Sequence, residues 1–238
     1  MKNLNIFTLL LITGVFVICV SCINLYPTIG NGNLIISEKT FSSFEKINIS
    51  GSAEVHFHAS REYRTVITVD SNLLGYTEIT TRSNTLNIGT KIGNYSFTKY
   101  LVDVYCPIVT GVSVSGSGLF TGNDAITTST FDSNVSGSGK IEGAIKCGNF
   151  SAKITGSGKI TVSGNGNDSE IDISGSGTFS GNGFTINNAV INITGSGNAN
   201  VYVTDNLNVN ISGSGNLNYR GDPRINSRVR GSGQINKL

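Results

Sequence analysis

Three carboxylate side chains alternate along one short stretch of the chain, at Asp168, Glu170 and Asp172. Alternate residues of a β-strand point to the same side, so the three carboxylates would share one face. Such a row could bind Ca²⁺ through its oxygen atoms, or supply the acid and base of a polysaccharide-cleaving enzyme. A solvated surface is the stronger interpretation, because Asp172 falls opposite Lys153 in the repeat described below and opposite charges on neighbouring strands form an ordinary, weakly stabilising pair.

His56 and His58 also alternate, and Glu54 precedes them in a Glu-x-His-x-His row. A Zn²⁺ site needs three or four convergent ligands, and no second cluster of ligand residues is visible in the sequence. We therefore expect exposed or half-buried surface histidines. Since no set of Ser, His and Asp stands out either, the sequence predicts no metal, no cofactor and no enzymatic activity.

Cys22 follows an apolar run of about 15 residues, Ile6–Val20, which is short for a bilayer span of roughly 20. The run ends in Cys-Val-Ser-Cys at 19–22, which resembles a bacterial lipobox, where the chain is cleaved before a cysteine that becomes acylated. We predict a lipoprotein signal peptide over residues 1–21, a lipid on Cys22 and a tether over 22–33. The protein would then be exported and lipid-anchored in the bacterial cell envelope, at the outer membrane or cell surface. The alternative is an uncleaved N-terminal membrane anchor, which also leaves the rest of the chain outside the cytoplasm.

A repeat of about nineteen residues runs through most of the chain and determines where the candidate side chains lie in the fold. The triplet Gly-Ser-Gly occurs seven times at steps of 18 to 21 residues, and a degenerate copy, Gly-Ser-Ala, begins at Gly51. The glycines of the seven triplets are Gly116, Gly118, Gly137, Gly139, Gly156, Gly158, Gly175, Gly177, Gly195, Gly197, Gly213, Gly215, Gly231 and Gly233. Such regular spacing indicates a repeat protein.

The residues around each triplet form two apolar columns. The residue two before the first glycine is Val or Ile in all eight copies, and the residue four after it is apolar. These positions are six residues apart, so in a strand they share one face with both glycines, while the middle serine takes the other. The pattern predicts an all-β, single-stranded β-solenoid whose rungs of 18–21 residues stack about 4.8 Å apart, with the glycines at tight turns. By analogy with crossover connections, we expect a right-handed coil.

The stretch from 34 to 110 alternates as strands without clear triplets, for example at Thr65–Val69 and Tyr100–Tyr105. We interpret it as irregular N-terminal rungs that cap the coil, because terminal repeats are usually atypical. A separate N-terminal domain is the alternative. Residues 111–238 then form the regular part of the β-helix.

Cys106 and Cys147 fall in nearly the same column of the repeat, two rungs apart. That separation is about 9–10 Å, beyond the roughly 7 Å limit between the Cα atoms of a disulfide. We expect both thiols to be reduced and buried.

Two kinds of surface feature could bind a partner. Asparagines stack in outward columns, where they could equally stabilise the coil through amide hydrogen bonds. Tyrosines of the N-terminal half would suit stacking on a glycan if they are exposed, although tyrosine is also a common strand residue. The stacked amides are Asn192 and Asn210, and Asn198, Asn216 and Gln234; the tyrosines are Tyr63, Tyr76, Tyr95, Tyr100 and Tyr105.

The repeats and the segments that flank them resemble a known family. Phe-Glu-Lys-Ile at 44–47 and Ser-Gly-Ser-Ala-Glu-Val at 50–55 precede the Val-Ser-Gly-Ser-Gly repeats, and Gly-Asn-Leu-Asn-Tyr-Arg-Gly-Asp-Pro at 215–223 precedes the last triplet. Over roughly residues 34–236, this pattern is similar to the head GIN domain family, described as auto-transporter adhesins of bacterial envelopes. The resemblance implies a pectate-lyase-like β-helix with Gly-Ser-Gly at tight turns and a role in adhesion. No catalytic residues are established for the family, so the resemblance assigns none to this chain.

Composition and motifs together favour a noncatalytic cell-envelope lipoprotein. Its β-helix would serve adhesion or the binding of a surface glycan or envelope protein, and its lipid would hold it at the membrane. The net charge of +2 provides no basic field for nucleic acid. One alternative is a polysaccharide lyase or hydrolase, which needs a groove with converging Asp, Arg or Lys residues; another is a structural or envelope-stress component without a ligand. The sequence leaves the oligomeric state open.

Overall fold

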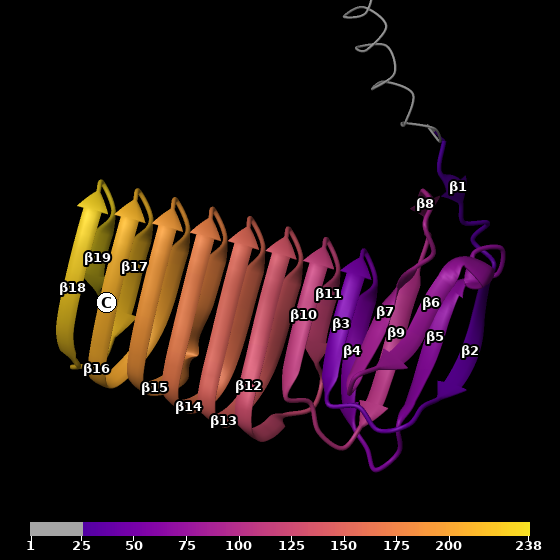
Figure 1. Cartoon of the computed structure of the whole chain (residues 1–238), viewed down its shortest axis with the longest axis horizontal. Helices are drawn as coiled ribbons and strands as arrows, with labels where there is room; N and C mark the ends of the chain where they lie inside the picture. Colours follow the sequence, from indigo (N-terminus) through magenta and orange to yellow (C-terminus); the bar gives the residue numbers. More distant parts are fainter. Residues whose placement is uncertain (1–25) are drawn as a thin grey trace, which may run out of the picture.

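The computed structural model describes residues 26–238 and shows a β-solenoid whose rungs advance along one axis (Figure 1). The predicted signal peptide, the lipidation site at Cys22 and the first residues of the predicted tether lie outside the described residues. The strands are β1 (Thr28–Ile29), β2 (Leu34–Thr40), β3 (Lys46–Gly51), β4 (Glu54–Ala59), β5 (Arg64–Asp70), β6 (Thr77–Arg82), β7 (Thr85–Thr90), β8 (Tyr95–Ser96), β9 (Tyr100–Cys106), β10 (Gly111–Gly116), β11 (Leu119–Gly122), β12 (Ile126–Gly137), β13 (Lys140–Gly156), β14 (Lys159–Gly175), β15 (Thr178–Gly195), β16 (Asn198–Gly213), β17 (Asn216–Arg220), β18 (Arg224–Gly231) and β19 (Gln234–Lys237), with one 3₁₀ turn at Leu74–Tyr76. Seventeen of these strands form one sheet. No helix within residues 26–238 has the length and apolar character needed to cross a bilayer.

Each central rung is one long strand that bends around the coil and pairs in parallel with its neighbours. In the four rungs β13–β16, Gly156 pairs with Gly175, Gly175 with Gly195 and Gly195 with Gly213. The β-branched column is likewise in register and buried, from Ile154 through Ile173 and Ile193 to Ile211. The fold predicted from the triplet spacing is therefore confirmed.

The coil is right-handed. Figure 1 shows the near strands rising to the triplet corners, where the chain crosses to the far side and descends as the rungs advance toward the C-terminus. We call the near part of this sheet, whose strands each end at the first glycine of a triplet, the front sheet, and the part made by the strands after each triplet the back sheet.

The two glycines of a triplet are required for different reasons. Gly156 has φ +109°, and a Cβ there would lie 2.7 Å from the carbonyl oxygen of Gly137 in the preceding rung. Gly158 turns inward, where a Cβ would lie 2.3 Å from Cγ1 of Val135. The first glycine therefore permits the turn, and the second lets the corner close on the apolar column.

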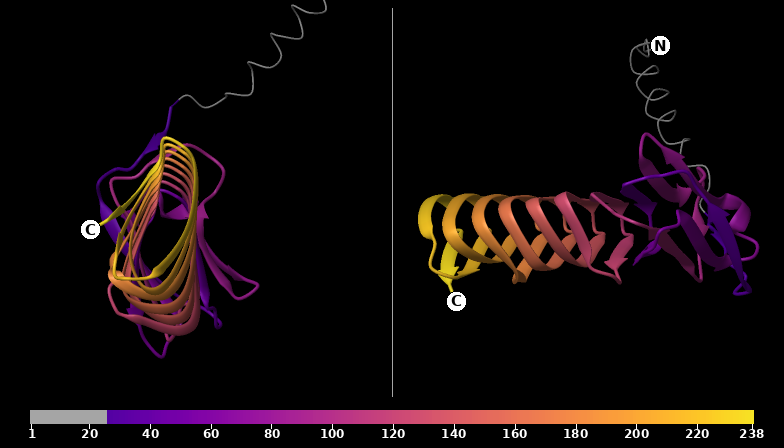
Figure 2. Two further views of the ribbon diagram at one scale, coloured as in Figure 1. Left: turned by 90° about the vertical axis from the view of Figure 1, so that its left-hand side faces the viewer. Right: turned by 90° about the horizontal axis from the view of Figure 1, so that it is seen from below.

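The N-terminal rungs do not follow the order of the sequence. The rung made by β3 and β4 stacks directly on the rung of β10 and β11, with Gly51 opposite Gly116. The chain between them forms the next rung outward, where β7 pairs with β3 and β9 pairs with β4. Beyond it, β2, β5 and β6 pair antiparallel and cover the end of the coil, which looks irregular beside the regular rungs (Figure 2).

One continuous apolar core fills the coil from Phe44 to Leu217. Aromatic side chains stack across rungs inside it: the rings of Phe131 and Phe150 lie 6.3 Å apart and nearly parallel, and Phe184 packs 4.9 Å from Phe150. Because this core takes the inward side chains, chemistry at the surface must use the outward columns.

Candidate functional site

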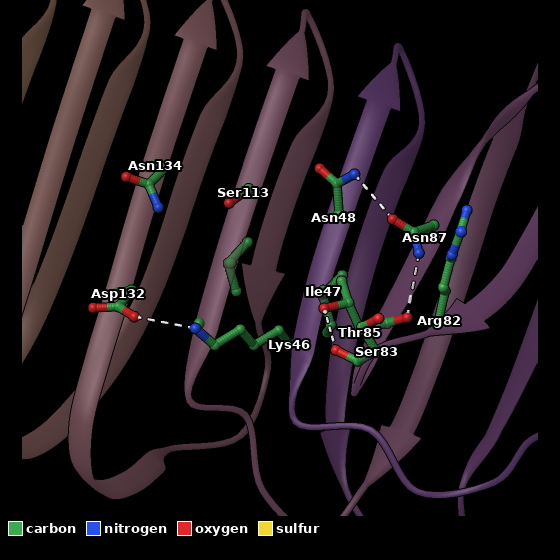
Figure 3. Close-up of a pocket in the computed structure, with 12 residues that line it drawn as sticks. Lys46, Ile47, Asn48, Arg82, Ser83, Thr85, Asn87, Ser113, Asp132 and Asn134 are labelled. Atoms are coloured by element: carbon green, nitrogen blue, oxygen red, sulfur yellow. Dashed lines mark hydrogen bonds and ion pairs between the residues drawn. The ribbon is translucent and has the colours of Figure 1, made fainter.

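An open, polar hollow crosses four neighbouring strands of the front sheet, β7, β3, β10 and β12 (Figure 3). Its volume is about 360 Å³. Two cations, one carboxylate, three amides and several hydroxyls face it: Lys46, Arg82, Asp132, Asn48, Asn87, Asn134, Ser83, Thr85 and Ser113.

The hollow exists because β10 places small residues between larger neighbours. Gly111 lies between Lys46 on β3 and Asp132 on β12. Lys46 extends over the glycine, so that its Nζ reaches Oδ2 of Asp132 at 3.4 Å. Both side chains are about half exposed, so the ion pair lies on the floor of the hollow in contact with solvent and contributes little to stability.

Amide side chains form the wall of the hollow on the side of the cap. Nδ2 of Asn48 donates to Oδ1 of Asn87 at 3.1 Å, and Nδ2 of Asn87 donates to the carbonyl of Thr85 at 3.3 Å. These bonds fix the direction in which the amides face. They leave the carbonyl oxygen of Asn48 available as an acceptor.

A tight hairpin carries Arg82 to the rim. Ser83 and Asn84 join β6 to β7 and have φ of 49° and 60°, as a two-residue type I′ turn requires. Arg82, the last residue of β6, is exposed beside this turn. Its guanidinium supplies up to five donors in a planar fork.

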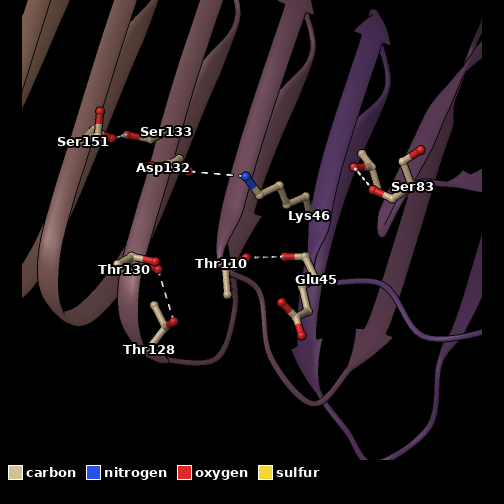
Figure 4. A network of polar contacts seen from close by, with 10 residues as sticks. Glu45, Lys46, Ser83, Thr110, Thr128, Thr130, Asp132, Ser133 and Ser151 are labelled. Atoms are coloured by element: carbon tan, nitrogen blue, oxygen red, sulfur yellow. Dashed lines mark hydrogen bonds and ion pairs between the residues drawn. The ribbon is translucent and has the colours of Figure 1, made fainter.

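Hydrogen bonds from hydroxyl side chains to backbone carbonyls connect the strands that carry the hollow (Figure 4). The buried Oγ of Ser133 donates to the carbonyl of Ser151 at 2.9 Å, and Oγ1 of Thr110 donates to the carbonyl of Glu45 at 3.2 Å. The first bond ties β12 to β13 next to Asp132, and the second ties the start of β10 to the start of β3 next to Lys46. The ion pair is therefore held on rigid strands.

A second hollow of about 460 Å³ adjoins the first and shares Asp132 with it. The predicted carboxylates Asp168 and Glu170 line it, and all three carboxylates of the row lie on the outward face of β14 as expected. Asp172 is opposite Lys153 on the neighbouring strand, as the repeat predicts. The row does not close around one point: Asp168 and Asp172 each accept a hydrogen bond from an asparagine amide of the next rung, at 2.9 and 2.8 Å.

Those two bonds begin ladders of side-chain amides that run along the coil. In every ladder the Nδ2 of the later rung donates to the Oδ1 of the earlier one, at 2.7–3.2 Å. The front ladders are Asp168–Asn188–Asn206 and Asp172–Asn192–Asn210, and the back ladders are Asn198–Asn216 and Asn200–Asn218–Asn236. Of the amides predicted to stack, Asn192 with Asn210 and Asn198 with Asn216 bond to each other, whereas Gln234 bonds to Asn216 through its backbone N–H and not through its side chain.

Cys106 and Cys147 are free and buried, as predicted, but their placement differs from the prediction. Cys106 on β9 is separated from β13, which carries Cys147, by both β4 and β11, so the cysteines lie three strand steps apart and not two rungs in one column. The error arose because the rungs at the N-terminal end do not follow sequence order. Burial raises the pKa of Cys106 to about 12 and that of Cys147 to about 11, which keeps both thiols protonated and unreactive at neutral pH.

The tyrosines are mostly unavailable for stacking on a ligand. Tyr76 is 41% exposed and faces the ring of Tyr95 at 4.9 Å. Tyr100 is buried and donates to the carbonyl of Gly89 at 2.7 Å. The remaining tyrosines of the predicted set, Tyr63, Tyr95 and Tyr105, are half-buried.

The geometry of the first hollow suits binding through hydrogen bonds. Amide and hydroxyl groups can both donate and accept, and Lys46 and Arg82 add groups that only donate. Asp132, the carboxylate that lines this hollow, is already paired with Lys46. Acid–base cleavage of a glycosidic bond needs a pair of carboxylates, which the lining of this hollow does not contain.

Sequence reasoning did not single out this hollow. Asn48, Ser113 and Asn134 occupy one outward column three residues before the triplets, a signal present in the repeat. Arg82 and Asn87 join them through the pairing of β3 with β7, for which the sequence has no periodic signal.

The fold and its polar outer face define the class of protein: a right-handed, single-stranded β-solenoid that displays a surface instead of enclosing a pocket. Residues 43–223 match the family described as "Putative auto-transporter adhesin, head GIN domain". The chain belongs to this family, which confirms the resemblance found in the sequence.

Solved structures share this architecture along nearly the whole chain. A "putative adhesin" from Parabacteroides merdae is 26% identical, with a TM-score of 0.72 and coverage of 89% of this chain and 98% of that one. A "putative lipid binding protein" from Parabacteroides distasonis is 28% identical, with a TM-score of 0.74 and coverage of 90% and 100%. A "putative adhesin" from Bacteroides fragilis, at 19% identity, shares the fold with a TM-score of 0.82 and coverage of 88% and 99%. The comparison with curated proteins found no match.

Proposed function

We propose that this protein is a noncatalytic, lipid-anchored adhesin of the bacterial cell envelope that binds a surface glycan through the first hollow of the front sheet. The observation that carries the proposal is the lining of that hollow, where amides, hydroxyls and two cations face solvent from rigid strands. Hydroxyl-rich glycans are recognised by such convergent donors and acceptors. The description of solved relatives as adhesins supports a role in attachment.

The same lining argues for a glycan over a lipid. One structural relative is described as a lipid-binding protein, but the first hollow of this chain exposes charged and amide groups where an acyl chain would need apolar ones. A sulfated or carboxylated glycan would fit best, because Arg82 adds a guanidinium at the rim that can bind an anionic group through two parallel hydrogen bonds.

Binding of the mature chain to an array of neutral and anionic glycans tests the proposal. Arg82→Ala and Asn134→Ala should each weaken binding of the best glycan at least tenfold, because each removes donors from the hollow. Arg61→Ala is the matched control, since Arg61 is exposed on a loop outside the hollow and its loss changes the net charge equally.

Three outcomes would contradict the proposal: no glycan binding by the wild type, equal binding by Arg82→Ala and wild type, or release of unsaturated or reducing ends from the bound glycan. The last result would indicate a lyase or hydrolase. The anchor is tested separately by partition of the wild type and Cys22→Ala into detergent after expression in a lipoprotein-processing host. Only the wild type should enter the detergent phase.

A further inference from the structure

A cluster of ionisable side chains lies on the back sheet near the cap, away from the hollows described above. β4 contributes Glu54, His56 and His58, and the adjacent strand β9 contributes Asp103. The sequence shows the first three as a Glu-x-His-x-His row, which falls short of a metal site because it lacks a further converging ligand. The parallel pairing of β4 with β9 supplies that ligand, since Asp103 lies directly opposite His56.

One carboxylate oxygen of Asp103 lies close to a ring nitrogen of each histidine. Oδ1 of Asp103 lies 2.9 Å from Nε2 of His58 and 3.7 Å from Nδ1 of His56. Ligand atoms about 2.0–2.1 Å from a tetrahedral Zn²⁺ are roughly 3.3 Å from each other. The two observed distances bracket that value, so Oδ1 of Asp103 lies at a separation from each ring nitrogen that is close to that of two ligands of one ion.

Glu54 fixes the orientation of one histidine. Its Oε1 lies 2.9 Å from Nε2 of His56, so a proton on Nε2 can be donated to Glu54 while Nδ1, on the side of Asp103, is left to coordinate an ion. A carboxylate behind the second ring nitrogen is the usual outer partner of a metal-bound histidine.

Aromatic packing holds the other histidine. The ring of His58 stacks on the ring of Tyr105, with 4.8 Å between the ring centres and 17° between the planes. The guanidinium of Arg64 lies over the Tyr105 ring, 3.9 Å from its centre. The side chains of His56, His58 and Asp103 keep 22–27% exposure, so an ion from solvent can reach them.

We propose that His56, His58 and Asp103 bind a divalent transition metal such as Zn²⁺, with water in the remaining positions and Glu54 as the orienting partner of His56. In residues 26–238 no group of three or more His, Cys, Asp or Glu side chains stands in metal-binding geometry, and His58 and Asp103 are hydrogen-bonded to each other. Binding would displace the proton between Nε2 of His58 and Oδ1 of Asp103, to Nδ1 of His58 or to solvent, so that both atoms could coordinate the ion.

Calorimetric titration of the full mature chain with ZnCl₂ tests the proposal. The wild type should bind one equivalent, and His58→Ala and Asp103→Asn should each weaken binding at least tenfold. Glu54→Gln should weaken it less, because Glu54 acts through His56. The matched control is Asp168→Asn with Glu170→Gln, which removes two exposed carboxylates from the front sheet and should leave Zn²⁺ affinity unchanged.

A second measurement covers the case in which a variant fails to fold. In the wild type, addition of Zn²⁺ should shift the ring nitrogen resonances of both histidines, and Co²⁺ should give visible absorption typical of four- or five-coordinate cobalt. Absence of Zn²⁺ binding by the wild type, unshifted histidine resonances, or equal affinity in folded His58→Ala and wild type would each overturn the proposal.

Discussion

At the scale of single residues, Asp70 holds the N-terminal segment against the cap. Its side chain is fully enclosed, and its two oxygens accept hydrogen bonds at 2.8 Å from the N–H groups of Gly32 and Thr98. Burial by itself raises the pKa of this carboxyl, but the bonds from Gly32 and Thr98 outweigh it and hold the pKa below the ordinary value of 3.8. Gly30 packs so closely on the carboxylate that a Cβ there would lie 2.3 Å from Oδ2.

Asp70→Asn should lower the melting temperature at pH 7. It should also make the melting temperature fall less steeply as the solution is acidified. A carboxyl whose pKa is depressed by folding stabilises the protein above its unfolded pKa, and that stabilisation is lost as pH falls through the lower, folded pKa. Thermal unfolding followed by circular dichroism between pH 2 and pH 7 would show the wild type losing more stability below about pH 4 than the variant. Identical pH profiles would show that Asp70 does not carry this stabilisation. Asp205→Asn, which changes an exposed carboxylate outside the cap, is the control.

At the scale of strands, the corner between the front and back sheets determines where each rung turns. Gly175 ends β14 with φ +115°, and a Cβ there would lie 2.7 Å from the carbonyl oxygen of Gly156 one rung earlier. A backbone carbonyl in a stacked rung cannot move aside alone. The strain of a side chain at this position would therefore spread to the neighbouring rungs.

Gly175→Ala should destabilise the protein by at least about 2 kcal/mol, from the left-handed backbone and the contact with Gly156 together. Gly143→Ala is the matched control, because the nearest atom to a Cβ at Gly143, outside its chain neighbours, is 3.8 Å away and its φ is not in the positive region. Chemical denaturation of both variants would measure the difference. A Gly175→Ala variant as stable as Gly143→Ala would show that the corner tolerates a side chain.

The regular strands could be predicted from sequence, and the cap could not, for a physical reason. The column that contains Ile154 and Ile173 depends on contacts between residues one rung apart, so the repeat of the sequence is the repeat of the structure. The contact of Gly51 with Gly116 joins residues 65 apart, after an excursion through strands of both directions. No period marks such a pairing.

The same distinction separates the candidate sites. The row from Asp168 to Asp172 follows from the alternation of one strand and was placed correctly on its outward face. Asp103 lies opposite His56 only because of the register in which the N-terminal strands pair. The same register brings Arg82 into the hollow that Asn48 lines. Sequence reasoning found three of the four residues of the histidine cluster and missed Asp103, which only folding brings to the others.

At the scale of the whole molecule, the coil has two different ends. The N-terminal end is covered by antiparallel strands, whereas the last front strand, β18, pairs only with β16. Its inward residues Ile225 and Val229 are 42% and 40% exposed, because no described rung covers them. Its outward residues Arg228 and Arg230 fall in the columns of Asn210 and Ser212.

These two arginines place positive charge in columns that hold neutral side chains in the preceding rung, which opposes the stacking of a further rung. If the last rung carried neutral side chains at these two positions, an amide could extend the asparagine ladder and a hydroxyl could extend the serine column. Another chain could then stack on this rung and continue the coil. Arginine in the same columns places like charges against any copy that approaches with the same edge. We therefore expect the arginines to oppose pairing of the exposed apolar residues Ile225 and Val229 with those of a second copy.

Replacing Arg228 by Asn and Arg230 by Ser should therefore promote association of the C-terminal ends. The double variant continues the residue types of the preceding rung, with Asn210 opposite position 228 and Ser212 opposite position 230. Sedimentation velocity over a hundredfold range of concentration should show it associating at concentrations at least tenfold lower than the wild type. Lys140→Asn with Lys159→Ser removes the same charge from the exposed side of the back sheet and should leave sedimentation unchanged. If the arginine variant sediments as the wild type does throughout that range, the charge on β18 is not what keeps the end free.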